Sequence, residues 1–157
     1  MNAPTNLLAE DEPTGVFLFH HTVKKLGILN PLHVAKDGRE ALDYLEGVGE
    51  FADRGKFPLP GLVILDLKMP RISGFGVLRQ MRQRPETQRT IVLMLTSSAS
   101  DEDIAEAYAL GVNGYLVKPL HLEKLQEMVQ AIKDFWLTHN HAPAVGDGSL
   151  TSECVSK

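Results

Sequence analysis

The chain has 157 residues, 43% of them hydrophobic, and a formal net charge of −4 at neutral pH. This length is typical of a single domain, and the apolar content suffices for a buried core without disulfide bonds or a structural metal. The single cysteine, Cys154, excludes a disulfide framework and a cluster of thiolate ligands, which fits a cytoplasmic protein. The negative charge argues against general nucleic-acid binding, and no signal peptide or membrane-spanning run is recognisable, so neither nucleic acid nor a membrane is an expected partner.

Short apolar runs and stretches of helical periodicity alternate along the chain. The runs have the length of buried strands, and apolar residues recur at helical spacing in the stretches between them. In chain order, the predicted elements are strand 7–9, helix 13–26, strand 31–35, helix 38–46, strand 62–65, helix 74–84, strand 91–95, helix 101–110, strand 114–117 and helix 122–136.

Proline and glycine mark the ends of several of these elements. Pro13 stands where the first residue of a helix tolerates proline, and Gly27 is a plausible end of that helix. Residues 47–61 are rich in glycine and proline and predict a surface loop. The small, polar residues at the end of the chain predict a flexible tail, so that the expected domain spans 1–138 and the tail spans 139–157.

Five strands that are each followed by a helix predict an α/β fold. Strands without polar alternation are buried on both faces, and this requires a parallel sheet that helices cover on both sides. The expected architecture is therefore a five-stranded parallel sheet with helices on both faces, of the flavodoxin-like type.

Polar residues follow four of the predicted strands directly. The first strand ends in Glu10 and Asp11, the third in Asp66, the fourth in Thr96 and the fifth in Lys118. Each of them alone is most simply an ordinary polar residue at a strand end. In a flavodoxin-like strand order, however, all four ends meet at one edge of the sheet, where open α/β sheets bind their ligands.

Such a cleft has a definite chemistry. Three crowded carboxylates repel one another and need a cation, and oxygen ligands of this kind select Mg²⁺. A lysine and a hydroxyl group opposite them are suited to the oxygens of a phosphoryl group. Asp66 is then the candidate nucleophile, which forms an acyl phosphate.

These residues stand in motifs that resemble a receiver domain of the two-component response regulators. The similarity runs from about Leu7 to Trp136 and rests on the N-terminal acidic pair, LDLKMPRISG, LTSS and KP. It implies the CheY-like receiver fold and Mg²⁺-dependent phosphorylation of Asp66 by a histidine kinase. A response regulator of this kind is a phosphoacceptor that dephosphorylates itself, and it is not otherwise an enzyme.

The resemblance also implies roles for the neighbouring residues. In this family the metal is held by the second acid, the phosphoacceptor and the backbone carbonyl two residues beyond it. These correspond to Asp11, Asp66 and the carbonyl of Lys68, with Glu10 acting through water.

The implied switch consists of residues around the phosphoryl group. Thr96 is expected to move toward the phosphoryl oxygens, which Lys118 also contacts, and Tyr115 is expected to turn inward behind it. The face formed by the fourth predicted helix, the fifth strand and the last helix then changes for a partner.

A narrower resemblance concerns the insertion GEFADRGKFPLPG and the ending IKDFW. Both are similar to the small single-domain regulators paired with cyanobacterial and bacterial phytochromes, some of which form homodimers. A phytochrome-type histidine kinase is therefore the expected partner. Phe135 and Trp136 are predicted to pack in the core, with a homodimer contact as the alternative.

Two other classes of function are weighed against the response regulator. A phosphatase of the haloacid-dehalogenase type also uses an aspartate at a strand end, but it needs a second acid where this chain has Lys68. An unphosphorylated pseudo-receiver would lack one of the key residues, and all of them are present here. The phosphorylated switch is therefore preferred.

Overall fold

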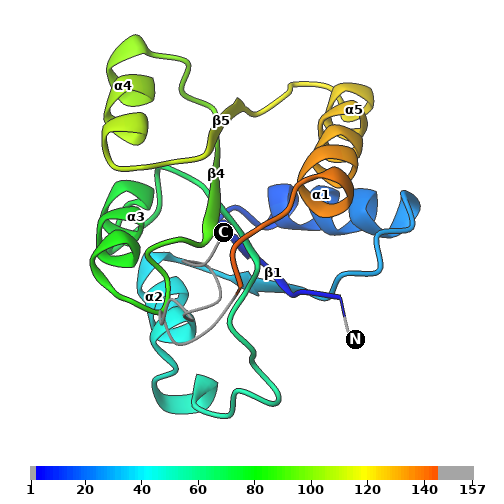
Figure 1. Cartoon of the computed structure of the whole chain (residues 1–157). Helices are drawn as coiled ribbons and strands as arrows, with labels where there is room; N and C mark the ends of the chain where they lie inside the picture. Colours follow the sequence, from blue (N-terminus) through cyan, green and yellow to red (C-terminus); the bar gives the residue numbers. More distant parts are fainter. Residues whose placement is uncertain (1–2, 145–157) are drawn as a thin grey trace, which may run out of the picture.

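The computed structural model describes residues 3–144 and shows one five-stranded sheet in that range (Figure 1). All four pairings are parallel, and the strand order is β2-β1-β3-β4-β5. This confirms the predicted fold class and the flavodoxin-like order. The strands are β1 (Asn6–Ala9), β2 (Leu32–Ala35), β3 (Leu62–Leu65), β4 (Ile91–Thr96) and β5 (Gly114–Val117).

Five α-helices cover the two faces of the sheet. They are α1 (Pro13–Lys25), α2 (Gly38–Glu46), α3 (Gly74–Gln83), α4 (Asp101–Ala109) and α5 (Leu122–Ile132). Figure 1 shows α1 and α5 on one side and α2, α3 and α4 on the other. Two apolar layers result: Leu7 of β1 packs into the layer under α2 and α3, and the next residue, Leu8, packs into the layer under α1 and α5. None of the helices within residues 3–144 is long and apolar enough to span a membrane.

Residues in the loops after the strands cap the N-termini of the helices. Pro13 is the first residue of α1, as predicted, and the Glu12 carboxylate accepts hydrogen bonds from the backbone N–H groups of Thr14 and Gly15. Ser73 caps α3 and Ser100 caps α4 in the same way. These caps fix where each helix starts relative to the edge of the sheet that carries the site.

The end of the last helix differs from the prediction. The α-helical part stops at Ile132, and the π-helix Lys133–His139 follows it directly. The side chain of Lys133 donates a hydrogen bond to the carbonyl of Leu26, at the end of α1. Phe135 is exposed in this segment, whereas Trp136 packs into the layer of α1 and α5. The predicted core packing is therefore confirmed for Trp136 and wrong for Phe135.

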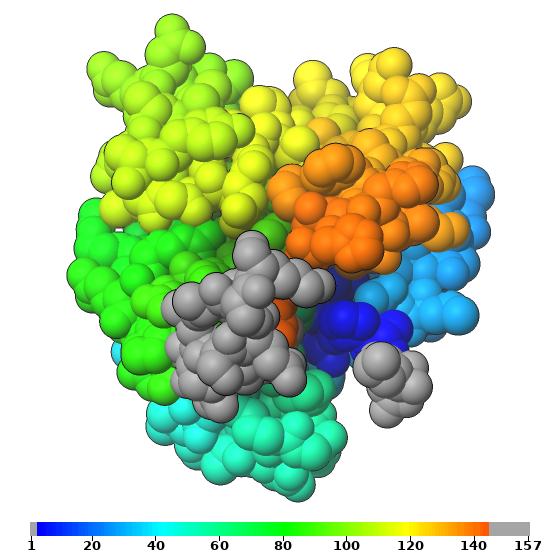
Figure 2. Space-filling view, in the orientation of Figure 1, coloured from blue at the N-terminus to red at the C-terminus, as the bar shows by residue number. Residues whose placement is uncertain are grey.

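The π-helix lies beside the start of the chain. Figure 2 shows its orange surface next to the dark blue N-terminal residues, and Trp136 and Asn6 line the same hollow there. This is the amino end of the strands, opposite to the edge where the polar strand ends meet. Residues 145–157, which hold most of the predicted tail and Cys154, lie outside the described part of the chain.

The predicted loop between α2 and β3 is anchored by one arginine. The Arg54 guanidinium donates hydrogen bonds to the carbonyls of Tyr44, Leu45 and Phe57, and a short 3₁₀ helix, Gly49–Phe51, lies within the loop. The first two carbonyls belong to the last turn of α2, where no helical partner is available. Arg54 therefore ties the loop to the end of the helix.

Candidate functional site

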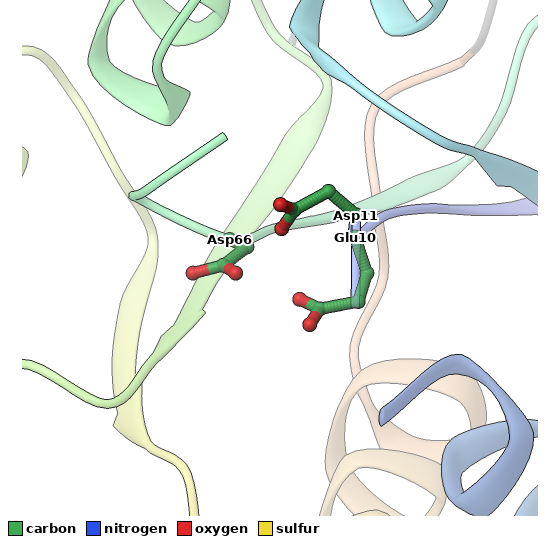
Figure 3. A group of neighbouring side chains, drawn as sticks. All are labelled: Glu10, Asp11 and Asp66. Carbon is green, nitrogen blue, oxygen red and sulfur yellow. The ribbon is translucent and has the colours of Figure 1, made fainter. Parts of the chain in front are cut away.

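The predicted acids meet at the carboxyl edge of the sheet. Glu10 and Asp11 follow β1 and Asp66 follows β3, and these two strands pair with Ala9 opposite Leu65. One carboxylate oxygen from each acid lies within 4.8 Å of the others, and Figure 3 shows the three side chains turned toward one another. Glu10 and Asp66 are buried, whereas Asp11 is exposed.

Lys118, which follows the edge strand β5, completes this cluster. Its Nζ lies 2.9 Å from Glu10 Oε1 and 3.1 Å from Asp66 Oδ2, and its backbone N–H donates to the carbonyl of Thr96. The meeting of Lys118 and Asp66 was predicted from the sequence. The bidentate contact between Lys118 and Glu10 was not, because nothing in a sequence shows which of several nearby acids a lysine reaches.

Burial and crowding shift the charges of this cluster. Burial raises the pKa of Glu10 to about 7, hydrogen bonding with Asp66 acts in the same direction, and Lys118 opposes both. Burial acts to lower the pKa of Lys118, but its hydrogen bonds to Glu10 and Asp66 outweigh this and the pKa is raised. One ammonium group therefore compensates the acids only in part.

The donor set fits a hard divalent cation. Three carboxylates offer oxygen ligands within reach of one ion, and one of them, on Asp11, is open to solvent. Mg²⁺ favours such a site, because it takes one or two carboxylates and keeps several water molecules. A second positive charge would also favour the ionised form of Glu10, whose pKa is raised mainly by burial and further by its neighbour Asp66.

The residues of the predicted switch form a second group next to the acids. Thr96 is fully buried, and its Oγ1 accepts a weak contact from the Ser98 N–H at 3.4 Å. The Tyr115 hydroxyl donates to the carbonyl of Ser98 at 2.9 Å, and the Ser98 hydroxyl donates to Asp103 of α4 at 2.6 Å. Ser98 thus links the strand end to α4, which sequence motifs alone did not indicate.

A hollow of about 580 Å³ opens beside the acids, between α1 and β2. Glu10 and Asp11 form one end of it, and Phe17 of α1, which is 67% exposed, stacks on His21 within it. Lys24 and Lys36 also line the hollow. The surface beside the acids is therefore apolar and carries positive charge.

The sequence matches the family model of the response regulator receiver domain over residues 7–130. It is 36% identical to response regulator Rcp1 of Synechocystis over 138 residues, which are 88% of this chain and 92% of Rcp1. The similarity thus extends over almost the whole of that relative.

Solved structures give the same result. Response regulator RPA3017 in red light signalling of R. palustris superposes with a TM-score of 0.85 at 37% identity, covering 90% of this chain and 99% of that chain. The phosphorylated cyanobacterial phytochrome response regulator RcpA gives a TM-score of 0.84 at 30% identity with the same coverage. The Mn²⁺-bound form of Rcp1 gives a TM-score of 0.81 at 35% identity, again with 90% and 99% coverage.

Proposed function

Because the chain belongs to the family of response regulator receiver domains, we propose that it accepts a phosphoryl group on Asp66 from the phosphohistidine of a sensor kinase. The observation that carries this proposal is the meeting of three carboxylates and one ammonium group at the carboxyl edge of the sheet. The chain is a two-component signalling protein and not an enzyme with a separate substrate.

The proposed reaction is an in-line displacement at phosphorus. An Asp66 carboxylate oxygen forms a bond to phosphorus while the phosphorus–nitrogen bond of the donor histidine breaks, and the electron pair stays on the imidazole nitrogen. Lys118, already 3.1 Å from Asp66 Oδ2, then interacts with the negative charge on the transferring group.

Asp11, Asp66 and the backbone carbonyl of Lys68 are the proposed ligands of Mg²⁺, with Glu10 acting through water. When bound, the ion supplies a positive charge that offsets the charge of the phosphoryl oxygens. The acid cluster supports this proposal, as does the Mn²⁺-bound form of the relative Rcp1.

The proposed signal passes through Thr96 and Tyr115. A phosphoryl group on Asp66 attracts the Thr96 hydroxyl, and the Ser98 carbonyl that now holds the Tyr115 hydroxyl moves with the same loop. The equilibrium of the face formed by α4, β5 and α5 shifts as a result. Val117, Leu120 and Leu122 expose apolar surface there, which supports a protein partner at this face.

The proposed donor is a phytochrome-type histidine kinase. The names of the relatives RcpA and RPA3017 refer to phytochrome and to red light signalling, and this supports the assignment. The apolar and cationic hollow beside α1 supplies a surface next to Glu10 and Asp11 on which a kinase can dock. We also propose that the exposed Phe135 contributes to a homodimer contact.

The first prediction tests the phosphoacceptor directly. Asp66→Asn removes the nucleophilic oxygen but keeps the size of the side chain, so labelling by acetyl phosphate in the presence of Mg²⁺ should disappear. Phosphoprotein gels or intact mass measure the label. Asp134→Asn, an exposed aspartate on the π-helix, is the matched control and should be labelled like the wild type. Full labelling of Asp66→Asn would overturn the assignment.

A further inference from the structure

The loop between β3 and α3 contains a strained turn next to the phosphoacceptor. Arg71 has a φ of 69°, and within residues 3–144 it is the only residue other than glycine with a positive φ. The Ile72 N–H donates to the Pro70 carbonyl at 2.8 Å, which closes a three-residue turn around Arg71. A turn of this kind costs about 1–3 kcal/mol and persists only when the surrounding structure enforces it.

Glycines of two helices leave room for this turn. A Cβ atom built on Gly38, the first residue of α2, would overlap the carbonyl oxygen of Ile72 and lie 2.8 Å from its Cβ. A Cβ atom on Gly76 of α3 would lie 2.7 Å from Ile72 Cγ2. Both distances are too short for real atoms, so Ile72 fits only because neither helix has a side chain at these positions. The surfaces of Gly38 and Gly76 thus form a notch that Ile72 fills, the Ile72 notch.

The other end of the loop is also fixed. The Gly74 N–H donates to the Leu67 carbonyl at 2.9 Å, and a Cβ atom on Gly74 would overlap the carbonyl oxygen of Asp66. The stretch between these anchors includes Lys68, whose N–H lies 3.4 Å from Asp66 Oδ1. The loop that follows the phosphoacceptor is therefore held by the contact of Gly74 with Leu67 and by the Ile72 notch.

We infer that Ile72 is a positioning residue for the divalent cation: by filling the notch, it holds the Asp66–Ser73 loop in its strained shape beside the acids. The inference rests on the proposed function only in taking the acid cluster as a Mg²⁺ site. Ile72 acts through the loop, because the turn around Arg71 would otherwise relax to a lower-energy conformation. A loop that relaxes no longer presents its backbone to the ion in one arrangement, and affinity falls.

The test measures Mg²⁺ binding separately from stability. Ile72→Ala empties the notch but leaves the three glycines unchanged, and we expect Mg²⁺ binding in isothermal titration calorimetry to weaken about tenfold. Leu110→Ala is the matched control, because Leu110 is also half-buried and packs on the same core layer but lies at the end of α4. It should lower the melting temperature and leave the Mg²⁺ dissociation constant unchanged.

Gly38→Ala gives a second route to the same result. Alanine favours a helix, but here its Cβ atom displaces the Ile72 carbonyl, so Mg²⁺ binding should again weaken. If Ile72→Ala binds Mg²⁺ as the wild type does, the inference is wrong, whether or not Gly38→Ala folds. If the wild type itself binds no Mg²⁺, the proposed cation site fails instead.

Discussion

Lys118 is the residue on which the charges of the site depend. It is the cation that lies within hydrogen-bond distance of two buried carboxylates, on Glu10 and Asp66, among the residues that the structure describes. Those side chains are only 5% and 9% exposed, so little water is available to solvate their negative charges if the ammonium group is lost. Lys118 is therefore expected to serve the fold of the resting protein as well as the proposed reaction.

Replacing Lys118 with alanine should destabilise the protein most when Mg²⁺ is removed. Breaking a buried pair costs about 3–5 kcal/mol, and here about 1–3 kcal/mol is expected, because Lys118 is partly exposed and Glu10 can take up a proton. Urea unfolding in chelator and in Mg²⁺ measures the difference. With Mg²⁺ present the loss should be smaller, because the ion replaces the missing charge.

The control for this experiment is Lys124→Ala, which removes an exposed pair with Glu127. Its stability should change little, with or without Mg²⁺. An equal loss for Lys118→Ala in both conditions would show that the lysine and the cation do not share the same carboxylates.

Helix α2 is held at both of its ends by contacts with loops. Its first residue, Gly38, meets Ile72 of the phosphoacceptor loop, and the free carbonyls of its last turn accept hydrogen bonds from Arg54. Around that turn, the rings of Tyr44, Phe51 and Phe57 pack edge to face or tilted against one another. His33 of β2 packs on Tyr44 and Phe57. The insertion thus packs as part of the domain on the side of α2.

Arg54→Ala should remove the cap of α2. Three carbonyls lose a charged donor, so we expect the free energy of unfolding to fall by about 1–3 kcal/mol in urea titrations. Arg89→Ala is the matched control, because Arg89 is exposed and makes no hydrogen bond or ion pair within residues 3–144. A loss of stability in both variants alike would contradict the capping role.

The same aromatic group predicts a dependence on pH. Burial lowers the pKa of His33, so the unfolded chain takes up a proton at a higher pH than the native protein does. The contribution of His33 to stability is therefore present above its unfolded pKa and is lost as the pH falls below it. His33→Phe should remove this part of the acid sensitivity in urea titrations at a series of pH values. An unchanged pH profile would contradict it.

The predictions that were confirmed rest on residue patterns that recur within a helix or strand and on residues that mark its end. Apolar runs, helical spacing and residues such as Pro13 located every strand and α-helix, and the strand ends located the acids. The π-helix that begins at Lys133 was not predicted, because its residues also fit α-helical spacing. The Ile72 notch and the Glu10–Lys118 contact were not predicted either, since both depend on how closely distant elements approach one another.

The two ends of the sheet carry different surfaces. The carboxyl edge holds the acids, whereas the amino edge is covered by the π-helix, from which Phe135 projects into solvent with 53% of its surface exposed. Its ring packs edge to face on Trp136, at a centroid distance of 4.8 Å, so its orientation on this surface is set by the tryptophan.

If Phe135 contributes to a homodimer, Phe135→Ser should shift sedimentation equilibrium toward the monomer. Truncation of a hot-spot residue at an interface weakens association by about 2 kcal/mol or more. Val48→Ser is the control, because Val48 is 50% exposed on the side of α2. A wild type that remains monomeric at every concentration would refute the dimer contact.

The contact between Glu10 and Lys118 spans 108 positions of the chain, so its two partners leave the ribosome at very different times. A ribosome that has released β1 to β4 has already exposed both N-terminal acids and Asp66, but the lysine that follows β5 is still missing. Until β5 emerges, the nascent chain therefore holds a phosphoacceptor without its ammonium group. Because domains generally fold as units during translation, the site forms only when Lys118 is present. In the proposed chemistry, a kinase therefore meets a reactive aspartate only after nearly the whole domain has been made.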